Sequence, residues 1–192
     1  IVGESPWENV EHMQNNDSHA ATYISWQDVK GKLLAKLGSN FNFPTEAQWE
    51  YSCRGGTLGR FFWGESVKEM GQYANVADMT LQKKSGEAFS PVKTKDGHIY
   101  IAPAGSFKPN SFGLYDMIGN VWEWCKDDPR YYNNEEKMDP VGKAKSNNRV
   151  FRGGGWASNE LNCLRSAYRL WTFNSYRHFE LGVRLIRCLS NY

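Results

Sequence analysis

The chain is 192 residues long, a length typical of one domain that buries a substantial core. Its 23 Lys and Arg residues nearly balance its 21 Asp and Glu residues, so the formal net charge of +2 gives no reason to expect a nucleic-acid-binding protein. No apolar run reaches the roughly 18 residues that a transmembrane helix needs, so none is predicted.

Two helices are predicted in the first third of the chain. Apolar side chains recur at 26, 29, 33, 34 and 37, the spacing of an amphipathic helix, and Ser25 is its predicted N-cap. A second helix should begin after Thr45, whose hydroxyl can cap it while Gln48 returns the capping-box bond. This helix is expected to end before Gly55 and Gly56.

Turns dominate the sequence from there to about residue 150, with a short strand predicted over 98–102. The last forty residues should contain two or three strands. One is predicted over 149–152, and another, with alternating side chains, over 181–187. The stretch 171–176, in which polar residues separate the aromatic ones, is expected to be a loop.

Three motifs rich in glycine and tryptophan fit neither a helical nor a strand period. They are Gly-Asn-Val-Trp-Glu-Trp at 119–124, Arg-Gly-Gly-Gly-Trp at 152–156 and Gly-Val-Arg at 182–184. Glycine permits positive φ or close backbone approach, and indoles bury large areas without regular structure. Aromatic residues make up 15% of the chain, so these motifs predict irregular backbone around an aromatic core.

Together with Phe-Pro-Thr-Glu-Ala-Gln-Trp-Glu-Tyr at 43–51 and Phe-Trp-Gly at 62–64, these motifs resemble the formylglycine-generating-enzyme family, also called the sulfatase-modifying-factor family. The resemblance runs from about Tyr23 to Arg187. It implies an α+β, C-type-lectin-like fold that is rich in loops, with short antiparallel strands and two helices. We therefore expect a single domain over 1–192. The chain begins at Ile1 without Met or a signal peptide, so we expect the N-terminal part of the family domain to be missing.

The resemblance also bears on catalysis. The oxidase branch of the family holds copper(I) with two cysteines that follow a Gly-Gly-Ser turn. Here Ser158 stands at the first cysteine position, Cys163 keeps the second, and Gly155 replaces the serine of the turn. A lone thiol cannot make a two-coordinate copper(I) site, so we expect neither copper nor formylglycine formation.

A second branch of the family makes ergothioneine-type thiol compounds with non-heme iron. Such a site needs three histidines, or two histidines and a carboxylate. The chain has only His12, His19, His98 and His178, among which no such set is apparent, so iron is not expected. An oxygen-dependent oxidase of the formylglycine or ergothioneine type remains the alternative function.

The four cysteines contain no Cys-x-x-Cys pair, so no zinc site is predicted. The resemblance suggests a disulfide between Cys53 and Cys188, since relatives can join the segment after the second helix to the C-terminal strand. Buried free thiols are the alternative.

Calcium is the ion that the resemblance supports, because the enzymes of this family hold two structural calcium ions in their loops. Asparagine and carboxylate oxygens and backbone carbonyls suit this cation. The first site would use the side chains of Asn75 and Asp96 and the carbonyls of Val76 and His98. The second would use the side chains of Asn120 and Glu123 and the carbonyl of Val121. The alternative is that Asn120 and Glu123 only bond neighbouring loop amides.

The segment 150–187 resembles the variable ligand-binding segment of the variable proteins of diversity-generating retroelements, which share this fold. Tyr, Trp, Phe, His and Ser on loops combine rigid aromatic area with adaptable polar groups, as in antibody binding sites. The candidate ligand-binding residues are Ala157, Ser158, Asn159, Leu161, Tyr168, Leu170, Trp171, Phe173, Ser175, Tyr176, His178 and Phe179. The alternative is that these aromatics pack into the core, an alternative that is strongest for Leu161 and Phe179. Trp171, Phe173 and Tyr176, with Tyr168 and His178, are expected to form one exposed patch.

We therefore expect a non-catalytic protein that displays this segment to a protein or glycan partner, outside the cytoplasm or at a bacterial or phage surface. The competing expectations are the oxidase named above and a structural scaffold such as a component of a secretion-machine ring. Neither nucleic acid nor a transmembrane segment is expected.

Overall fold

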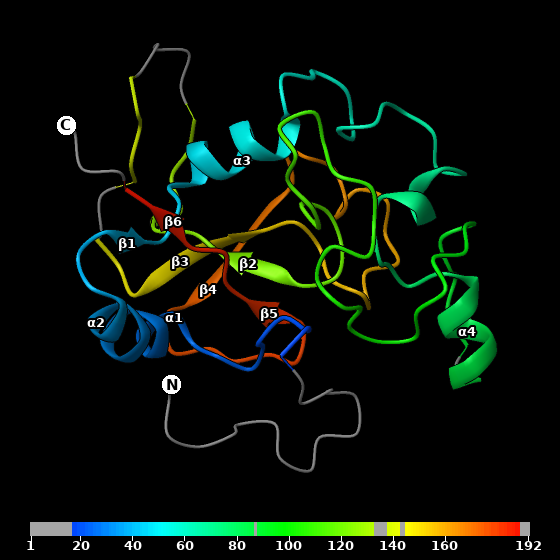
Figure 1. Ribbon diagram of the computed structural model, residues 1–192, viewed down its shortest axis with the longest axis horizontal. Helices are drawn as coiled ribbons and strands as arrows, with labels where there is room; N and C mark the ends of the chain where they lie inside the picture. The colour runs from blue at the N-terminus through cyan, green and yellow to red at the C-terminus, as the bar shows by residue number, and fades with distance from the viewer. Residues whose placement is uncertain (1–16, 87, 133–137, 143–144, 189–192) are drawn as a thin grey trace.

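Two small β-sheets lie among long loops in the computed structural model, which describes residues 17–86, 88–132, 138–142 and 145–188 (Figure 1). The larger sheet has the strand order β4-β3-β2-β5. Its strands are β2 (Trp122–Trp124), β3 (Asn148–Arg152), β4 (Arg169–Phe173) and β5 (Leu181–Gly182). β3 runs antiparallel to β2 and to β4, whereas β5 runs parallel to β2. The smaller sheet pairs β1 (Phe41–Asn42) antiparallel with β6 (Ile186–Arg187).

Both predicted helices are present and begin at the predicted caps. The first is continuous through α1 (Trp26–Asp28), a π-helical turn (Val29–Leu33) and α2 (Leu34–Leu37). Ser25 and Asp28 form a capping box at its start, and Thr45 and Gln48 form another at the start of α3 (Glu46–Arg54). α3 ends at Gly55, which has a φ of 54°, a value that glycine adopts without strain.

The structure corrects the prediction at several elements. A further helix, α4 (Met79–Ser85), is capped by the side chain of Asp78. The predicted strand over 98–102 is a loop, because side chains bond its peptide groups: Asn75 Nδ2 donates to the carbonyl of Tyr100, and the Asn120 amide bonds both the N–H and the carbonyl of Ala102. The single strand expected over 181–187 is divided into β5 and β6. The expected loop over 171–176 begins as strand β4.

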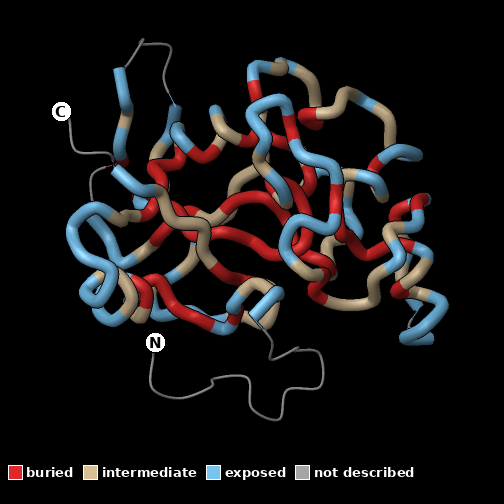
Figure 2. Tube along the Cα trace, viewed as in Figure 1, coloured by how far each residue is buried: buried red, intermediate tan, exposed pale blue. Residues whose placement is uncertain are grey.

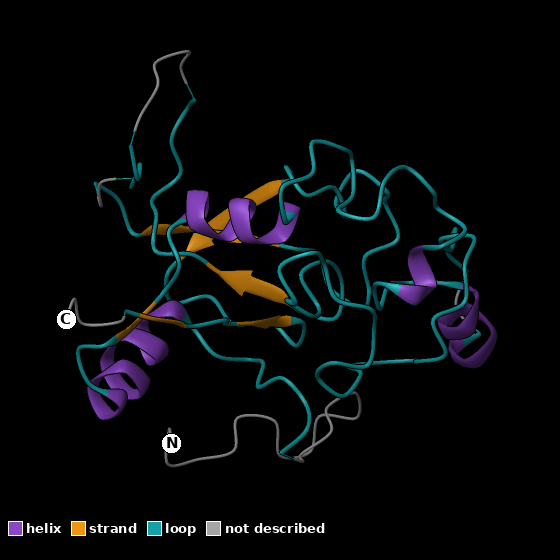
Figure 3. Ribbon diagram, turned by 45° about the horizontal axis from the view of Figure 1, so that its top comes forward, coloured by secondary structure: helices purple, strands orange, loops and turns teal. Residues whose placement is uncertain are grey.

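The helices lie at separate places around the larger sheet. α3 lies over one of its faces, and α4 lies at the opposite end of the molecule from α1 and α2 (Figures 1 and 3). Buried residues run through the sheet and into the loops beside it, while the outer turns are exposed (Figure 2). No described helix has the length and apolar character needed to cross a membrane. The result is a C-type-lectin-like α+β fold, as predicted.

A buried arginine joins α3 to the larger sheet. Arg152, on β3, has no measurable exposure, and its Nε lies 3.0 Å from Glu46 Oε1 while its Nη2 pairs with Glu50. Its Nη1 donates to the carbonyls of Ser166 at 3.2 Å and Tyr168 at 2.7 Å, in the segment that leads into β4. Arg152 and Glu46 are therefore buried with partners, which is the condition under which such burial is tolerated, while Glu50 is partly exposed.

Replacing this arginine should be far more costly than replacing an exposed one with the same partner. Arg152→Met removes one of the two cations that pair with the buried Glu46 and leaves the buried carbonyl of Ser166 without this donor, so it should lower the free energy of unfolding by about 3 kcal/mol. Arg54, whose pair with Glu50 spans 2.9 Å in partly exposed surroundings, is the matched control, and Arg54→Met should cost less than about 1 kcal/mol. Urea unfolding measures both. Equal losses would show that burial of Arg152 is not what matters.

Candidate binding face

β4 and the turn after it carry three exposed aromatic side chains. Trp171 is 53% exposed, Phe173 is 66% exposed and Tyr176 is 42% exposed. Trp171 and Phe173 are two residues apart on β4, so they share one face of the strand. The N–H of Tyr176 donates to the carbonyl of Phe173 at 2.9 Å, which folds the turn back beside the strand. The Tyr176 ring stacks with His178 at a centroid distance of 6.0 Å.

The remaining candidate ligand-binding residues do not belong to one surface. Tyr168 and Leu170 pack against the core around Trp122, and Leu161 packs against the core around Trp49. Ala157 and Phe179 pack against the core around Trp156, where the Phe179 ring lies 5.4 Å from the indole. Ser158 is half-buried, whereas Asn159 and Ser175 are exposed. The surface closest to the predicted patch is therefore Trp171, Phe173 and Tyr176, edged by His178, without Tyr168.

The turn that would carry copper chemistry in the oxidases presents one hydroxyl and one thiol. The Gly155 N–H donates to Ser158 Oγ at 3.0 Å, and the Ser158 carbonyl accepts from the Ala77 N–H at 3.1 Å. Cys163 is half-buried, and its contact with the Tyr168 hydroxyl raises the pKa of that tyrosine. Within the described residues, no group of three or more His, Cys, Asp or Glu side chains is placed to hold a metal ion.

The predicted disulfide is not formed. All four cysteines are free, and Cys188 is exposed while Cys53 is fully buried. Cys53 Sγ lies 3.7 Å from the carbonyl of Met117, and burial raises the pKa of its thiol to about 12. Burial also raises the pKa of Cys125 well above its usual range. Cys53 and Cys125 are therefore unreactive core residues, which agrees with the alternative of buried free thiols.

Gly155 makes room for a carboxyl group that the sequence did not reveal. A Cβ at this position would overlap the carboxyl of Glu180, so the serine of the family turn cannot be accommodated without displacing that side chain. Glu180 Oε2 accepts from the Ala157 N–H at 3.1 Å, and burial raises the pKa of Glu180 to about 7. Its other oxygen lies 3.8 Å from His178 Nδ1, but burial lowers the pKa of that histidine, so both groups favour their neutral forms. The only sequence signal was a charged residue between Phe179 and Leu181.

Restoring the serine should therefore destabilise the protein through Glu180. Gly155→Ser should lower the free energy of unfolding by about 1–3 kcal/mol, the usual cost of overpacking. Most of that loss should disappear in the Glu180→Ala background, a coupling that a double-mutant cycle measures by chemical unfolding. Gly31→Ser is the control, because nothing lies within 4 Å of a Cβ there. An unchanged stability of Gly155→Ser would contradict the packing argument.

In the structure, three residues of the first predicted calcium site, Val76, Asp96 and His98, are in contact. Asp96 accepts from the N–H groups of Val76 and His98, each at 2.8 Å, and its pKa is raised to about 7 by burial and by nearby Asp78. Asn75 Nδ2 is bonded, whereas Asn75 Oδ1 is buried without a hydrogen-bond partner. A buried carboxylate and an orphaned amide oxygen are groups that a hard cation would compensate.

The second predicted calcium site presents its carboxylate to an arginine instead. Arg184 donates to both oxygens of Glu123, at 2.8–3.1 Å, and to the carbonyls of Tyr115 and Asp116. Glu123 Oε2 also accepts from Trp49 Nε1 at 2.7 Å. Asn120 Oδ1 accepts from the Ala102 N–H and from Asn75. The described contacts at this site match the alternative of hydrogen bonding within the loops.

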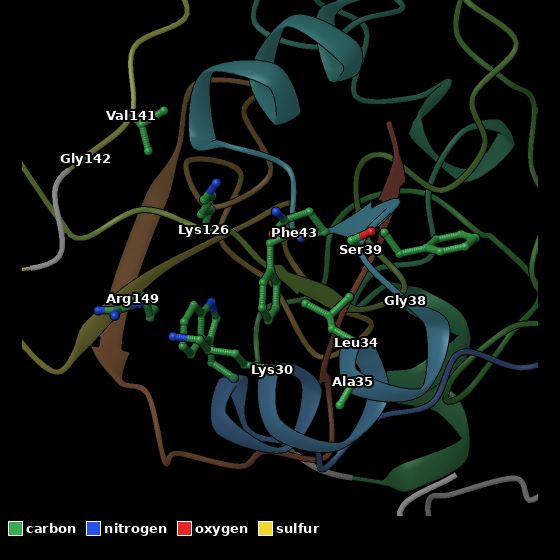
Figure 4. A pocket seen from close by; sticks show the side chains of 13 residues that line it. Lys30, Leu34, Ala35, Gly38, Ser39, Phe43, Lys126, Val141, Gly142 and Arg149 are labelled. Atoms are coloured by element: carbon green, nitrogen blue, oxygen red, sulfur yellow. Dashed lines mark hydrogen bonds between the residues drawn. The ribbon is translucent and has the colours of Figure 1, made fainter. Parts of the chain in front are cut away.

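A cleft that the sequence did not indicate lies between the first helix and β1. It has a volume of about 670 Å³, and its walls include Leu34 and Phe43 (Figure 4). Lys30, Lys126 and Arg149 are charged residues of its lining, which includes no acidic side chain among the described residues. The Arg149 guanidinium lies 4.4 Å from the centroid of the Trp26 ring. The cleft could hold a small ligand with an apolar body and a negative charge.

The fold and these motifs define a formylglycine-generating-enzyme-like domain of the C-type-lectin type. The family described as "Sulfatase-modifying factor enzyme 1-like domain" matches residues 3–189, and the chain belongs to that family. It is 36% identical over 153 residues to a formylglycine-generating enzyme of Streptomyces coelicolor, covering 77% of this chain and 45% of the relative. It is 32% identical over 149 residues to an inactive C-alpha-formylglycine-generating enzyme 2 of Bos taurus, covering 77% of this chain and 38% of that protein. The chain thus spans less than half the length of these relatives.

Two solved structures show the same architecture. PvdO from Pseudomonas aeruginosa superposes with a TM-score of 0.74 at 29% identity, covering 92% of this chain and 65% of that one. Treponema denticola variable protein 1 superposes with a TM-score of 0.71 at 20% identity, covering 96% of this chain and 78% of that one. The second likeness concerns the fold alone.

Proposed function

We propose that the chain is a non-catalytic, ligand-binding member of its family that presents β4 and the following turn to a partner. The observation that carries the proposal is the exposure of Trp171, Phe173 and Tyr176 on an element whose other face is anchored in the core. Leu170, on that other face, packs with the core residues around Trp122. A rigid strand that holds aromatic side chains in solvent limits the entropy lost when a partner covers them.

Three further points support this proposal. Exposed aromatic side chains carry much of the energy of protein interfaces once a partner desolvates them. The fold is that of a variable protein, a type of protein that displays binding surfaces, although the identity to it is only 20%. The turn that precedes β4 offers Ser158 where an oxidase would need a second thiolate. In this role the protein would act outside the cytoplasm or at a cell surface.

The second candidate function is an oxygen-dependent oxidase of the formylglycine-generating or ergothioneine type. The identity of 36% to a formylglycine-generating enzyme favours it. Against it stand the replacement of a copper thiolate by Ser158 and the occupation of the turn by Glu180, which fills the place of the family serine. The presence of inactive enzymes among the relatives fits a family in which the fold persists without the chemistry.

An activity assay of the copper(I)-loaded protein with a substrate peptide distinguishes the two candidate functions. The loaded protein, incubated in air with a cysteine-containing sulfatase peptide, should leave the mass of the peptide unchanged, because Cys163 alone cannot hold copper(I) in a two-thiolate site. Ser158→Cys is the matched variant: it restores the second thiol and should bind copper(I) more tightly, as a competition with a chromogenic chelator would measure. An aldehyde-containing peptide formed by the unaltered protein would overturn the non-catalytic proposal.

We further propose that the first predicted site holds a structural calcium ion. Asn75 Oδ1 and Asp96 would be its side-chain ligands, with the carbonyls of Val76 and His98, and the ion would supply the positive charge that the paired carboxyls of Asp96 and Asp78 lack. Burial and the neighbouring Asp78 raise the pKa of Asp96, and a bound cation would oppose both effects. The second set is not included, because Arg184 already binds Glu123.

Calcium should therefore stabilise the fold through one site. At a free concentration about a hundred times its dissociation constant, it should add about 2.7 kcal/mol to the free energy of unfolding. Asp96→Asn should abolish the calcium-dependent rise in melting temperature, whereas Glu123→Gln should keep it. The measurement is thermal unfolding with and without chelator. A response that survives in Asp96→Asn but is lost in Glu123→Gln would move the ion to the second set.

A further inference from the structure

We infer that the partner of the binding face is an extended polypeptide, which adds to the larger sheet as a fifth strand along the outer edge of β4. This inference rests on the proposed function and selects polypeptide over glycan as the partner. It depends on where the backbone groups of β4 point, which the hydrogen bonds around β3 determine.

Strand β3 divides its backbone groups between its two neighbours. The Cys125 N–H donates to the Val150 carbonyl, and the Val150 N–H donates to the Asp127 carbonyl, so Val150 directs its groups toward β2. Trp171 lies opposite Val150 on β4. In an antiparallel ladder, bonded and non-bonded pairs alternate, so this pair is non-bonded. The N–H and carbonyl of Trp171 therefore point away from β3.

The same alternation applies along the rest of β4. The Asn174 N–H donates to the carbonyl of Asn147, so it faces β3, as do the groups of Thr172 and Leu170; the Asn174 carbonyl instead accepts from the Gln27 N–H. The N–H of Phe173 therefore points outward with the groups of Trp171. Among the described residues, no backbone or side-chain hydrogen bond engages the Trp171 N–H, the Trp171 carbonyl or the Phe173 N–H. Within the part of the chain that the structure describes, β4 is the last strand of its sheet, so these three groups form an open edge there.

The side chains along this edge do not protect it from pairing with another strand. Edge strands are usually protected by lysine, proline, a bulge or a covering loop. Here the residues with outward backbone groups are Trp171 and Phe173, both more than half exposed. A polypeptide strand satisfies alternating N–H and carbonyl groups and places its own side chains beside the two aromatics. A sugar can stack on the indole but has no backbone repeat to match the edge.

The chemistry of the partner strand follows from this register. The residue opposite Trp171 would exchange both hydrogen bonds with it, and its side chain would lie on the same face as the indole. The residue two positions along the partner, toward Phe173, shares that face. We therefore expect a segment with apolar residues at two alternate positions.

A peptide with one blocked edge tests the inference. The probe is acetyl-Thr-Val-Thr-Val-Thr-Val-Thr-amide with N-methyl groups on the threonines, which leaves only the valine edge able to pair. Its matched control has the same sequence with N-methyl groups on both the threonines and the valines, so neither of its edges can donate hydrogen bonds. The first peptide should shift the NMR amide signals of Trp171 and Phe173 and slow their hydrogen exchange. The control should bind about tenfold more weakly or worse, because it has no N–H group that could donate to the Trp171 carbonyl.

Two variants of Trp171 distinguish the contribution of its backbone N–H to binding from that of its indole side chain. Trp171→Pro removes the outward N–H while Leu170 and Thr172 keep their bonds to β3, and it should abolish binding of the first peptide. Trp171→Thr keeps the N–H but loses the indole, so it should weaken binding and retain the preference for the first peptide. If the proline variant does not fold, the comparison of the two peptides still decides the matter.

Three outcomes would overturn the inference. Equal shifts by both peptides, or shifts outside β4, would show that the edge is not the binding element. Shifts of Trp171 by chitotriose but by neither peptide would assign the face to a glycan. A dimer in sedimentation that Trp171→Pro converts to monomer would show that a second copy occupies the edge. The non-catalytic proposal fails instead if the unaltered protein converts the sulfatase peptide to an aldehyde, a result that these outcomes neither require nor exclude.

Discussion

The buried guanidinium of Arg152 is the interaction on which the arrangement of the other elements depends. It pairs with two carboxylates of α3 and binds the carbonyls of Ser166 and Tyr168. Arg169, the first residue of β4, extends the network by binding the far oxygen of Glu46 at 2.5 Å. Because buried ions must be paired, this network allows one position of α3 relative to β3 and β4. It thereby ties the start of β4 to α3.

Side chains take over the hydrogen bonding that strands would provide in a more regular fold. Asn75 and Asn120 bond the loop at 100–102, and Asn110 bonds the end of α3 and the turn after it. Asp127 and Asp128 accept from backbone N–H groups of the segment before β3. Buried peptide groups must be satisfied, and a short polar side chain can do this where the chain curves too sharply for a ladder. Long loops can therefore remain ordered.

The family scaffold carries two separable regions in this chain. Around the glycine turn, Gly155 and Glu180 fit one another, and Ser158 replaces a thiol, which changes the chemistry open to the turn. Beyond it, Trp171 and Phe173 stand on the edge of the sheet without taking part in the core. The two regions are linked by the segment that Arg152 binds, so residues of the turn can change while the edge stays in position. This separation is how one fold hosts both enzymes and binding proteins.

Local signals in the sequence determined both N-terminal helices and the family. Ser25 and Thr45 act over three residues, so their capping boxes can be read without knowledge of the fold. The motifs around Trp124, Trp156 and Gly182 could also be recognised in the sequence alone, and the family resemblance that they carry predicted the fold class.

Other features of the protein depend on contacts between residues that are distant in the sequence, and only the tertiary structure reveals them. Glu123 is bound by Arg184, 61 residues away, and Gly155 is matched to Glu180. Stretch 98–102 alternates like a strand but is a loop, because Asn75 and Asn120 take its hydrogen bonds. The stretch 171–176 contains turn-forming polar residues, yet its first half is a strand because β3 offers it a complete ladder. Pairing across such distances leaves no periodic trace in the sequence, so which edge of the sheet stays open is determined by the folded structure.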